Sequence, residues 1–204
     1  MSHYFTNEDL KSNIRKVKVK IKDKEFIFNT DNGVFSKKGL DFGTRSLLDV
    51  LIDLDLSGDI LDIGCGYGVI GIILSSFFLV NVDLVDINKR AIHLSKLNAK
   101  ENKVSCNIFL SDCFDSIEKK YDFIITNPPI RAGKDIVYKI LFGAKDYLVP
   151  GGSLIFVMNK DQGAKSVKKD LEKVGNVEIL HKNKGFYIIR VIFRWQFDMF
   201  MVII

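Results

Sequence analysis

The stretch of residues 59–68 constrains the fold of this chain more than any other. It reads D-I-L-D-I-G-C-G-Y-G, with three glycines at alternate positions, and an apolar run at 69–79 follows it directly. An apolar segment with an acid, a glycine-rich turn and a helix-like run predict a buried strand, a tight turn and a helix. Glycine suits such a turn because it tolerates positive φ angles and lets a ligand approach the backbone. We therefore expect the first βα unit of a nucleotide-type α/β fold.

Segments with strand and helix patterns alternate through the rest of the chain. The expected further strands are residues 80–85, 106–110, 121–126, 153–159, 177–181 and 186–193, and the expected helices are 46–56, 69–79, 89–101, 135–147 and 166–174. This alternation predicts a Rossmann-like α/β fold with a mainly parallel seven-stranded sheet and helices on both faces. The turn between the last two strands predicts a C-terminal antiparallel hairpin. Thr44 or Ser46 would cap the helix at 46–56.

The N-terminal part has a different pattern, in which apolar and basic residues alternate at 16–22. It predicts a β extension with one apolar and one basic face, which turns near residues 31–33. Residues 11–24 carry seven basic groups and one acid. The basic face could contact RNA phosphates, or it could be a solvated face whose lysines discourage edge pairing. Residues 1–10 would form a turn or short helix, and the apolar tail at 194–204 a last strand or an interface segment.

Size and composition narrow the function classes. The chain has 204 residues, 47% of them hydrophobic and 27% charged, which suits one folded domain and argues against disorder. The net charge of +5 permits an acidic partner such as RNA without requiring one. The three cysteines form no C-x-x-C pair and the three histidines show no ligand spacing, so we expect neither a disulfide nor a metal site. We find no signal-peptide pattern and no membrane-spanning run, and expect a soluble, cytoplasmic protein.

Polar residues follow the expected strands at their carboxyl ends. Asp62, Asp86 and Asp112 come at the ends of the first three strands, and Asn127 with two prolines ends the fourth. In an open parallel sheet these ends lie along one edge, where ligands bind. We expect Asp86 to accept both hydroxyls of a ribose and Asp112 to accept from an adenine amino group. Either acid could instead cap a helix or belong to a loop.

Two kinds of cofactor, dinucleotides and S-adenosylmethionine, bind at this edge of such a sheet, and the charge of Asp62 favours one of them. Residues 66–71 match the G-x-G-x-x-G pattern of NAD-binding folds, although this match is weak alone. Asp62 would repel the pyrophosphate of a dinucleotide. The same acid suits S-adenosylmethionine, which has a sulfonium and an amino group and no phosphate. The electrostatics therefore favour S-adenosylmethionine over NAD.

Two motifs and several longer runs resemble a known family. D-I-G-C-G-Y-G at 62–68 resembles the first motif of class I S-adenosylmethionine-dependent methyltransferases, and N-P-P-I at 127–130 resembles the motif of those that methylate conjugated amino groups. The runs at 35–48, 127–134 and 160–166 are similar to the small-methyltransferase-domain family, which includes guanine-N2 methyltransferases of small-subunit ribosomal RNA. The resemblance covers about residues 4–193. It implies one methyltransferase domain over residues 1–204, with a β extension at 1–34 and the core at 35–204.

The resemblance also implies which residues bind the cofactor. The candidates lie ahead of the first strand, in the glycine turn and at the next three strand ends. They are Gly43, Thr44, Asp62, Gly64, Cys65, Gly66, Gly68, Asp86, Ile87, Asp112, Cys113 and Asn127. Gly43 and Thr44 would close over the methionine end of the cofactor, and the two cysteines would be small fillers.

The catalytic candidates are Asn127, Pro128, Pro129 and Ile130. The side-chain oxygen of Asn127 and the carbonyl of Pro128 would accept the two N–H groups of the target amine, which turns its lone pair toward the methyl group. The prolines stiffen the turn, and Ile130 would pack on the base. Catalysis would rest on proximity and alignment. Guanine N2 of small-subunit ribosomal RNA is the leading acceptor; adenine N6, a protein glutamine amide and a non-catalytic RNA-binding role stay open, as does the oligomeric state.

Overall fold

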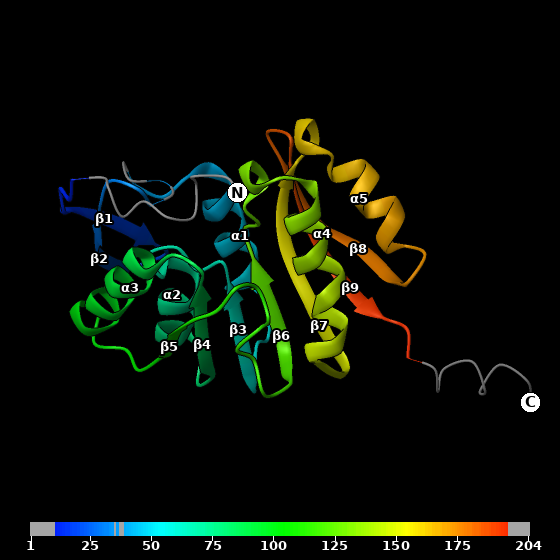
Figure 1. Cartoon of the computed structure of the whole chain (residues 1–204), viewed down its shortest axis with the longest axis horizontal. Coiled ribbons are helices and arrows are strands. Elements are labelled where there is room, and N and C mark those ends of the chain that lie inside the picture. The colour runs from blue at the N-terminus through cyan, green and yellow to red at the C-terminus, as the bar shows by residue number, and fades with distance from the viewer. Residues whose placement is uncertain (1–10, 35, 37–38, 196–204) are drawn as a thin grey trace, which may run out of the picture.

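The computed structural model describes residues 11–34, 36 and 39–195 (Figure 1). The polar terminus at 1–10 and residues 196–204 of the apolar tail lie outside the described residues, so the expectations for them stay untested. Among the described residues no helix is long and apolar enough to cross a membrane. The same residues contain no group of three or more His, Cys, Asp or Glu that could hold a metal ion.

A seven-stranded sheet forms the centre of the molecule (Figure 1). Its strands are β3 (Asp59–Ile63), β4 (Asn81–Asp86), β5 (Asn107–Leu110), β6 (Tyr121–Thr126), β7 (Leu148–Asn159), β8 (Gly175–Asn183) and β9 (Phe186–Phe193). The order is β5-β4-β3-β6-β7-β9-β8. Strands β3 to β7 are parallel, and β9 is antiparallel to both β7 and β8. The mainly parallel sheet with a C-terminal antiparallel hairpin is confirmed.

Helices cover both faces of this sheet (Figure 1). They are α1 (Phe42–Leu51), α2 (Val69–Phe77), α3 (Lys89–Glu101), α4 (Lys134–Gly143) and α5 (Ala164–Leu171). Buried side chains of α1, α2 and α3 form one core with residues such as Ile60 and Ile125 of the strands. Those of α4 and α5 form a second core with Leu61 and Ile124. Neighbouring strand residues thus belong to opposite cores, as the two-residue period of a strand requires.

Two elements begin well before the sequence patterns predict. Helix α1 begins at Phe42, before the expected start, because Asp41 caps it rather than Thr44 or Ser46. The Asp41 side chain accepts a hydrogen bond from the N–H of Thr44 at 3.1 Å. Strand β7 begins at Leu148 and continues through residues 150–152, with a register shift against β6 that accommodates the proline and glycines.

The N-terminal residues form a separate antiparallel pair, β1 (Arg15–Ile21) and β2 (Lys24–Thr30). The chain reverses at residues 22–23, where Lys22 has a φ of 51°, a turn that the sequence pattern did not predict. The expected turn near 31–33 is also present, at residues 32–33 directly after β2. The alternating pattern is itself confirmed, because Val19 and Ile21 are buried while the lysines on either side of them are exposed. The alternation identifies which side chains of the strand are buried, but because it is uniform along residues 16–22 it does not identify where the chain reverses.

Asn98 of α3 and Asn102, which caps the C-terminus of this helix, hold the edge of β2 that faces away from β1. Asn98 accepts from the N–H of Asn29 at 2.6 Å and donates to its carbonyl at 2.9 Å. One helical turn later, Asn102 does the same for Ile27, at 3.0 and 2.8 Å. Each amide therefore replaces a neighbouring strand and satisfies the backbone groups of this edge. The hairpin is fastened in this way to the helix that follows β4.

Candidate active site

The glycine turn connects β3 to α2 at the carboxyl edge of the sheet, beside the place where the strand order reverses. Gly64 and Gly66 have φ angles of 71° and 58°, in the left-handed region. A Cβ atom added to either residue would meet nothing within 4 Å, whereas one added to Gly68 would lie 3.0 Å from the Ser95 hydroxyl. The first two glycines therefore leave open space for a ligand, and the third allows close packing.

Helix α3 supports this turn with side chains that sequence reasoning missed. The Ser95 hydroxyl donates to the carbonyl of Gly66 at 2.9 Å. The amide of Asn98 donates to the carbonyl of Tyr67 at 2.8 Å. Both side chains are fully buried. Their spacing of three residues, on the apolar face of the expected helix 89–101, is the signal that could have identified them.

Asp62 does not lie on the exposed edge, contrary to the expectation that an acid ends the first strand. It is the fourth residue of β3, is fully buried, and faces α2. Its Oδ2 accepts from the N–H of Gly71 at 2.9 Å, in the first turn of a helix whose N-cap, Gly68, has no side chain. The carboxylate thus supplies the capping bond that Gly68 cannot provide.

The second oxygen of Asp62 makes the residue suitable for a cationic ligand. Oδ1 is buried and has no hydrogen-bond partner among the described residues. Burial raises the pKa of the Asp62 carboxyl to about 7; the bond from Gly71 opposes this rise and the neighbouring Asp86 adds to it. A buried acceptor without a donor is costly, and an ammonium group could supply both a proton donor and a compensating charge. The residues present therefore fit the amino group of S-adenosylmethionine.

Asp86 ends β4 and bridges the glycine turn to α3. Its Oδ2 accepts from the N–H of Gly66 at 2.9 Å, and its Oδ1 from the N–H of Asn88 at 2.8 Å. Burial raises the pKa of Asp86, and backbone hydrogen bonds from Asn88, Gly66 and Ile87 oppose that rise. Each carboxylate oxygen can accept more than one bond, so both keep capacity for ligand hydroxyls. Ile87 is half-buried beside it.

The loop after β5 places its two candidates differently. The Asp112 side chain is 49% exposed and lies 3.6 Å from the ammonium group of Lys139 on α4. Cys113 is buried with a φ of 52°, and burial raises its pKa to about 11. Cys65 in the glycine turn is also buried, and burial raises its pKa well above the usual value. Burial therefore disfavours the thiolate form of both cysteines, which suits small packing residues rather than nucleophiles.

Asn127 follows β6 and is joined to the start of α1 by a chain of hydrogen bonds. Its Nδ2 donates to the hydroxyl oxygen of Thr44 at 2.8 Å. That hydroxyl in turn donates to Oδ2 of Asp41 at 2.6 Å. A carboxylate only accepts, so the single Thr44 proton is used on Asp41, and Thr44 must accept from the amide nitrogen. The side-chain oxygen of Asn127 therefore points away from Thr44, and no described residue donates to it.

The Asn-Pro-Pro segment turns directly into a short 3₁₀ helix, Ile130–Ala132. The Pro128 carbonyl already accepts from the N–H of Ile130 at 2.9 Å, and the Pro129 carbonyl accepts from the N–H of Ala132 at 2.9 Å. A carbonyl has two lone pairs, so Pro128 can still accept one further bond. Ile130 is half-buried against the core that contains α4. The turn is therefore rigid, with Asn127 at its start.

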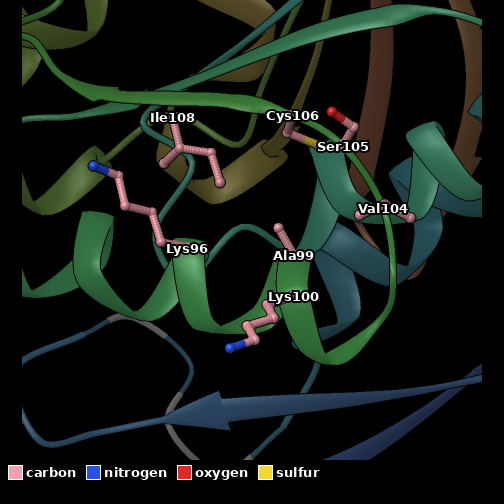
Figure 2. Close-up of a pocket in the computed structure, with 7 residues that line it drawn as sticks. All are labelled: Lys96, Ala99, Lys100, Val104, Ser105, Cys106 and Ile108. Carbon is pink, nitrogen blue, oxygen red and sulfur yellow. The ribbon is translucent and has the colours of Figure 1, made fainter.

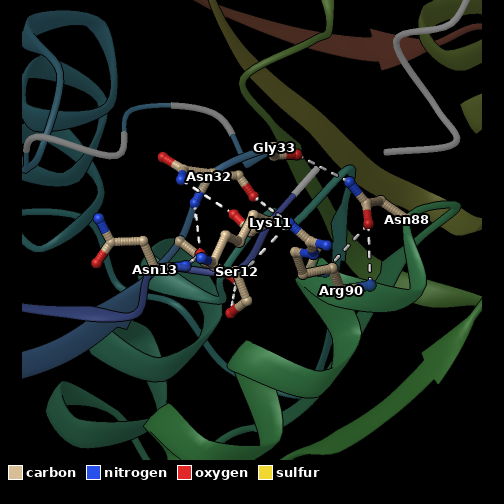
Figure 3. Close-up of polar contacts among 9 residues, drawn as sticks. Lys11, Ser12, Asn13, Asn32, Gly33, Asn88 and Arg90 are labelled. Carbon is tan, nitrogen blue, oxygen red and sulfur yellow. Dashed lines mark hydrogen bonds and ion pairs between the residues drawn. The ribbon is translucent and has the colours of Figure 1, made fainter. Parts of the chain in front are cut away.

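A polar cluster joins the segment after β2 to the first turn of α3 (Figure 3). Asn88 donates to the carbonyl of Gly33 at 3.1 Å, and the guanidinium group of Arg90 donates to the carbonyl of Asn32 at 2.7 Å. Asp31 lies 3.8 Å from Arg90. The N-terminal segment is thus held beside Asp86, at the end of β4.

One surface depression lies away from these residues (Figure 2). It has a volume of about 430 Å³ and is lined by Lys96, Ala99, Lys100, Val104, Ser105, Cys106 and Ile108. These residues belong to the second half of α3, the loop that follows it and the amino end of β5. The depression is therefore at the opposite end of the strand from Asp112 and does not belong to the site.

Comparisons with known proteins agree on the family to which this chain is similar. The sequence model of the Methyltransferase small domain family matches residues 25–190. The chain is 41% identical over 194 residues to the uncharacterized protein YbxB of Bacillus subtilis (strain 168), covering 92% of this chain and 96% of that protein. It is 41% identical over 143 residues to the Ribosomal RNA small subunit methyltransferase C of Mannheimia succiniciproducens, covering 66% of this chain and 42% of that protein.

A solved structure shares the fold. The T. thermophilus 16S rRNA N2 G1207 methyltransferase (RsmC), in complex with AdoMet and guanosine, has a TM-score of 0.80 at 24% identity. The match covers 89% of this chain and 51% of that chain. At this level of identity the likeness concerns the fold. The chain thus spans only 42% to 51% of the length of these ribosomal RNA methyltransferases.

Proposed function

The chain belongs to the methyltransferase small domain family, and we propose that it methylates the exocyclic N2 amine of a guanine in small-subunit ribosomal RNA. The family defines the enzyme class, a methyltransferase that uses S-adenosylmethionine. We further propose that the β1–β2 hairpin and the seven-stranded core act as one methyltransferase domain. A ribosomal substrate would place the enzyme in the cytoplasm.

The observation that carries this proposal is the orientation of Asn127. The bonds through Thr44 to Asp41 turn its amide nitrogen inward and leave its oxygen as a free acceptor. An aromatic amine is a poor nucleophile because its lone pair is delocalised into the ring. The Asn127 oxygen and the free lone pair of the Pro128 carbonyl would accept its two N–H groups and keep the nitrogen lone pair out of the ring. Ile130 would pack against the base.

The same edge of the sheet offers groups for each part of the cofactor. Asp62 Oδ1 would accept from its amino group, Asp86 from the ribose hydroxyls, and Asp112 from the adenine amino group. The open faces of Gly64 and Gly66 leave room beside these carboxylates. When bound, S-adenosylmethionine supplies an electrophilic methyl group. The residues themselves contribute binding, orientation and acceptor groups, so no strong base is needed.

The test uses Asn127→Ala, with Asn176→Ala as the matched control. Asn176 is exposed at the start of β8, far along the chain from the site. We expect Asn127→Ala to bind S-adenosylmethionine as the wild type does in calorimetry, yet to lose about a hundredfold or more in tritiated methyl transfer to small-subunit RNA. The control should keep both properties.

The acceptor is identified by digesting the labelled RNA to nucleosides. Label in N2-methylguanosine supports the proposal, whereas label in N6-methyladenosine or in protein reassigns the acceptor. Wild-type turnover in Asn127→Ala would remove the proposed role of this residue.

A further inference from the structure

The turn between β8 and β9 lies at the same edge of the sheet as the proposed site. Phe186, the first residue of β9, pairs with Asn159, the last residue of β7. The N–H of Lys160 donates to the carbonyl of Gly185 at 2.7 Å and fixes the turn to the end of β7. Figure 1 shows this turn, in orange, at the carboxyl end of β7. The C-terminal hairpin therefore extends the edge on which Asn127 lies.

Two aromatic rings connect this turn to Asn127. The rings of Phe42 and Phe186 are 5.6 Å apart and tilted by 51°. A Cβ atom added to Gly43 would lie 2.9 Å from the Phe186 ring, so only glycine lets that ring approach α1 so closely. The next residue, Thr44, holds the Asn127 amide. Both rings are half-buried, so part of each stays open to solvent beside the site.

Three exposed lysines lie at this edge of the sheet. The ammonium group of Lys184 lies 5.1 Å from the centre of the Phe42 ring. That of Lys182 lies 5.1 Å from the centre of the Tyr187 ring, on the opposite face of the hairpin from Phe186. Lys160 is exposed at the end of β7. Within the described part of the chain, none of these three lysines forms an ion pair with a carboxylate. Their charge is available to a polyanion.

Three lysines of the N-terminal hairpin do form ion pairs with carboxylates. The ammonium group of Lys16 lies 2.8 Å from Glu101, and that of Lys18 lies 3.1 Å from Glu25. Lys22 lies 2.9 Å from Asp53. A phosphate would have to compete with these three carboxylates, which favours the alternative that this strand has a solvated basic face.

We propose that Phe42, Lys160, Lys182, Lys184 and Phe186, which we name the rim surface, bind an unpaired segment of the substrate RNA next to the target base. The lysines would contact phosphates, and the rings would stack on bases. Stacking requires an unpaired strand, because the bases of an A-form helix are covered by their neighbours. This proposal rests on the proposed function, and it adds that the RNA is single-stranded where it is held.

The test compares two pairs of exposed lysines. Lys182→Gln/Lys184→Gln removes two charges from the rim surface, and Lys96→Gln/Lys100→Gln removes two from α3, beside the depression at the amino end of β5 (Figure 2). Fluorescence anisotropy measures the Kd for a labelled, unstructured oligoribonucleotide of about 12 nucleotides. Titrations at several salt concentrations measure the slope of log K against log salt.

We expect the rim variant to weaken binding about tenfold or more near 0.1 M salt and to reduce the salt slope by about 1.4, since each phosphate contact with a single strand contributes about 0.7. The α3 variant should keep the wild-type slope. Phe42→Leu should weaken binding about fivefold or more without changing the slope. All three variants should bind S-adenosylmethionine normally in calorimetry, which verifies the fold.

The proposal is overturned if the two lysine pairs lose affinity equally, if neither loses it, if the wild type does not bind the oligonucleotide, or if a duplex of the same sequence binds as tightly. A failure of the proposed function gives a different result. In that case the wild type binds the oligonucleotide through the rim surface and yet transfers no methyl group to RNA.

Discussion

The hydroxyl of Thr44 offers a direct test of how Asn127 is oriented. Thr44→Val keeps the shape of the side chain and removes the hydroxyl that joins Asn127 to Asp41. The cap of α1 survives, because Asp41 still accepts from the backbone N–H at position 44. Thr44→Ser is the matched control, since it keeps the hydroxyl. The perturbation is therefore confined to the orientation of one amide.

The expected effect follows from the two bonds. The neutral bond at 2.8 Å has a net value of about 1 kcal/mol, and the bond to the carboxylate at 2.6 Å about 2 kcal/mol. Without them, the Asn127 amide can rotate and present its nitrogen to the substrate. A loss of about 1–3 kcal/mol of transition-state stabilisation lowers kcat roughly 5- to 150-fold. Thr44→Ser should stay within about threefold of the wild type.

Steady-state methyl transfer and calorimetry measure this effect. We expect kcat to fall in Thr44→Val while the Kd for S-adenosylmethionine stays unchanged. In an Asn127→Ala background the same change should have no further effect, because the two residues act as one unit. The reasoning is refuted if Thr44→Val raises the Kd for the cofactor and its effect adds to that of Asn127→Ala. Thr44 would then contact the methionine end directly, as the family resemblance implies.

Two further predictions concern buried polar groups. Because folding raises the pKa of Asp62 to about 7, the folded state holds this proton more tightly than the unfolded chain, so the ligand-free protein should lose stability as the pH rises from about 4 to 7. A cationic cofactor prefers the ionised form of the Asp62 carboxyl, so the affinity for the cofactor should rise up to about tenfold per pH unit toward pH 7. Calorimetry should detect the release of a proton on binding. Asp62→Asn should abolish this pH dependence. If the affinity of the wild type for the cofactor did not change with pH, the proposed contact between Asp62 and the amino group of the cofactor would be wrong. Asn98→Ala should lower the free energy of unfolding, measured in urea, by about 3 kcal/mol, because Asn29 and Tyr67 lose buried partners. Asn102 is only half-buried, so Asn102→Ala should lower it by about 1 kcal/mol. If the two variants lost equal free energies of unfolding, burial would not explain the contribution of Asn98.

Much of the fold follows from local patterns. The βα unit at 59–77, helix α3 and strands β6 and β9 match their expected boundaries closely, because each is marked by its own periodicity and its own turn residues. The topology of parallel strands then requires Asp86, Asp112 and Asn127 to follow strands along one edge. Boundaries were wrong where the chain offers more than one local signal: α1 is capped by Asp41 rather than by Thr44 or Ser46, and the hairpin reverses at 22–23 within a uniform alternating pattern.

The sequence by itself determined the methyl-donor chemistry: an acid and alternating glycines at the first strand end, and Asn-Pro-Pro at the fourth, are contiguous motifs. Only the tertiary structure decided what their side chains contact. It placed Asp62 beneath α2, with one oxygen that has no partner among the residues the structure describes, and joined Asn127 to Thr44, 83 residues away. It also paired Lys16 with Glu101 and left Lys184 beside Phe42. Periodicity reports the face on which a residue lies, whereas hydrogen bonds and ion pairs depend on distances between segments that only the folded chain brings together.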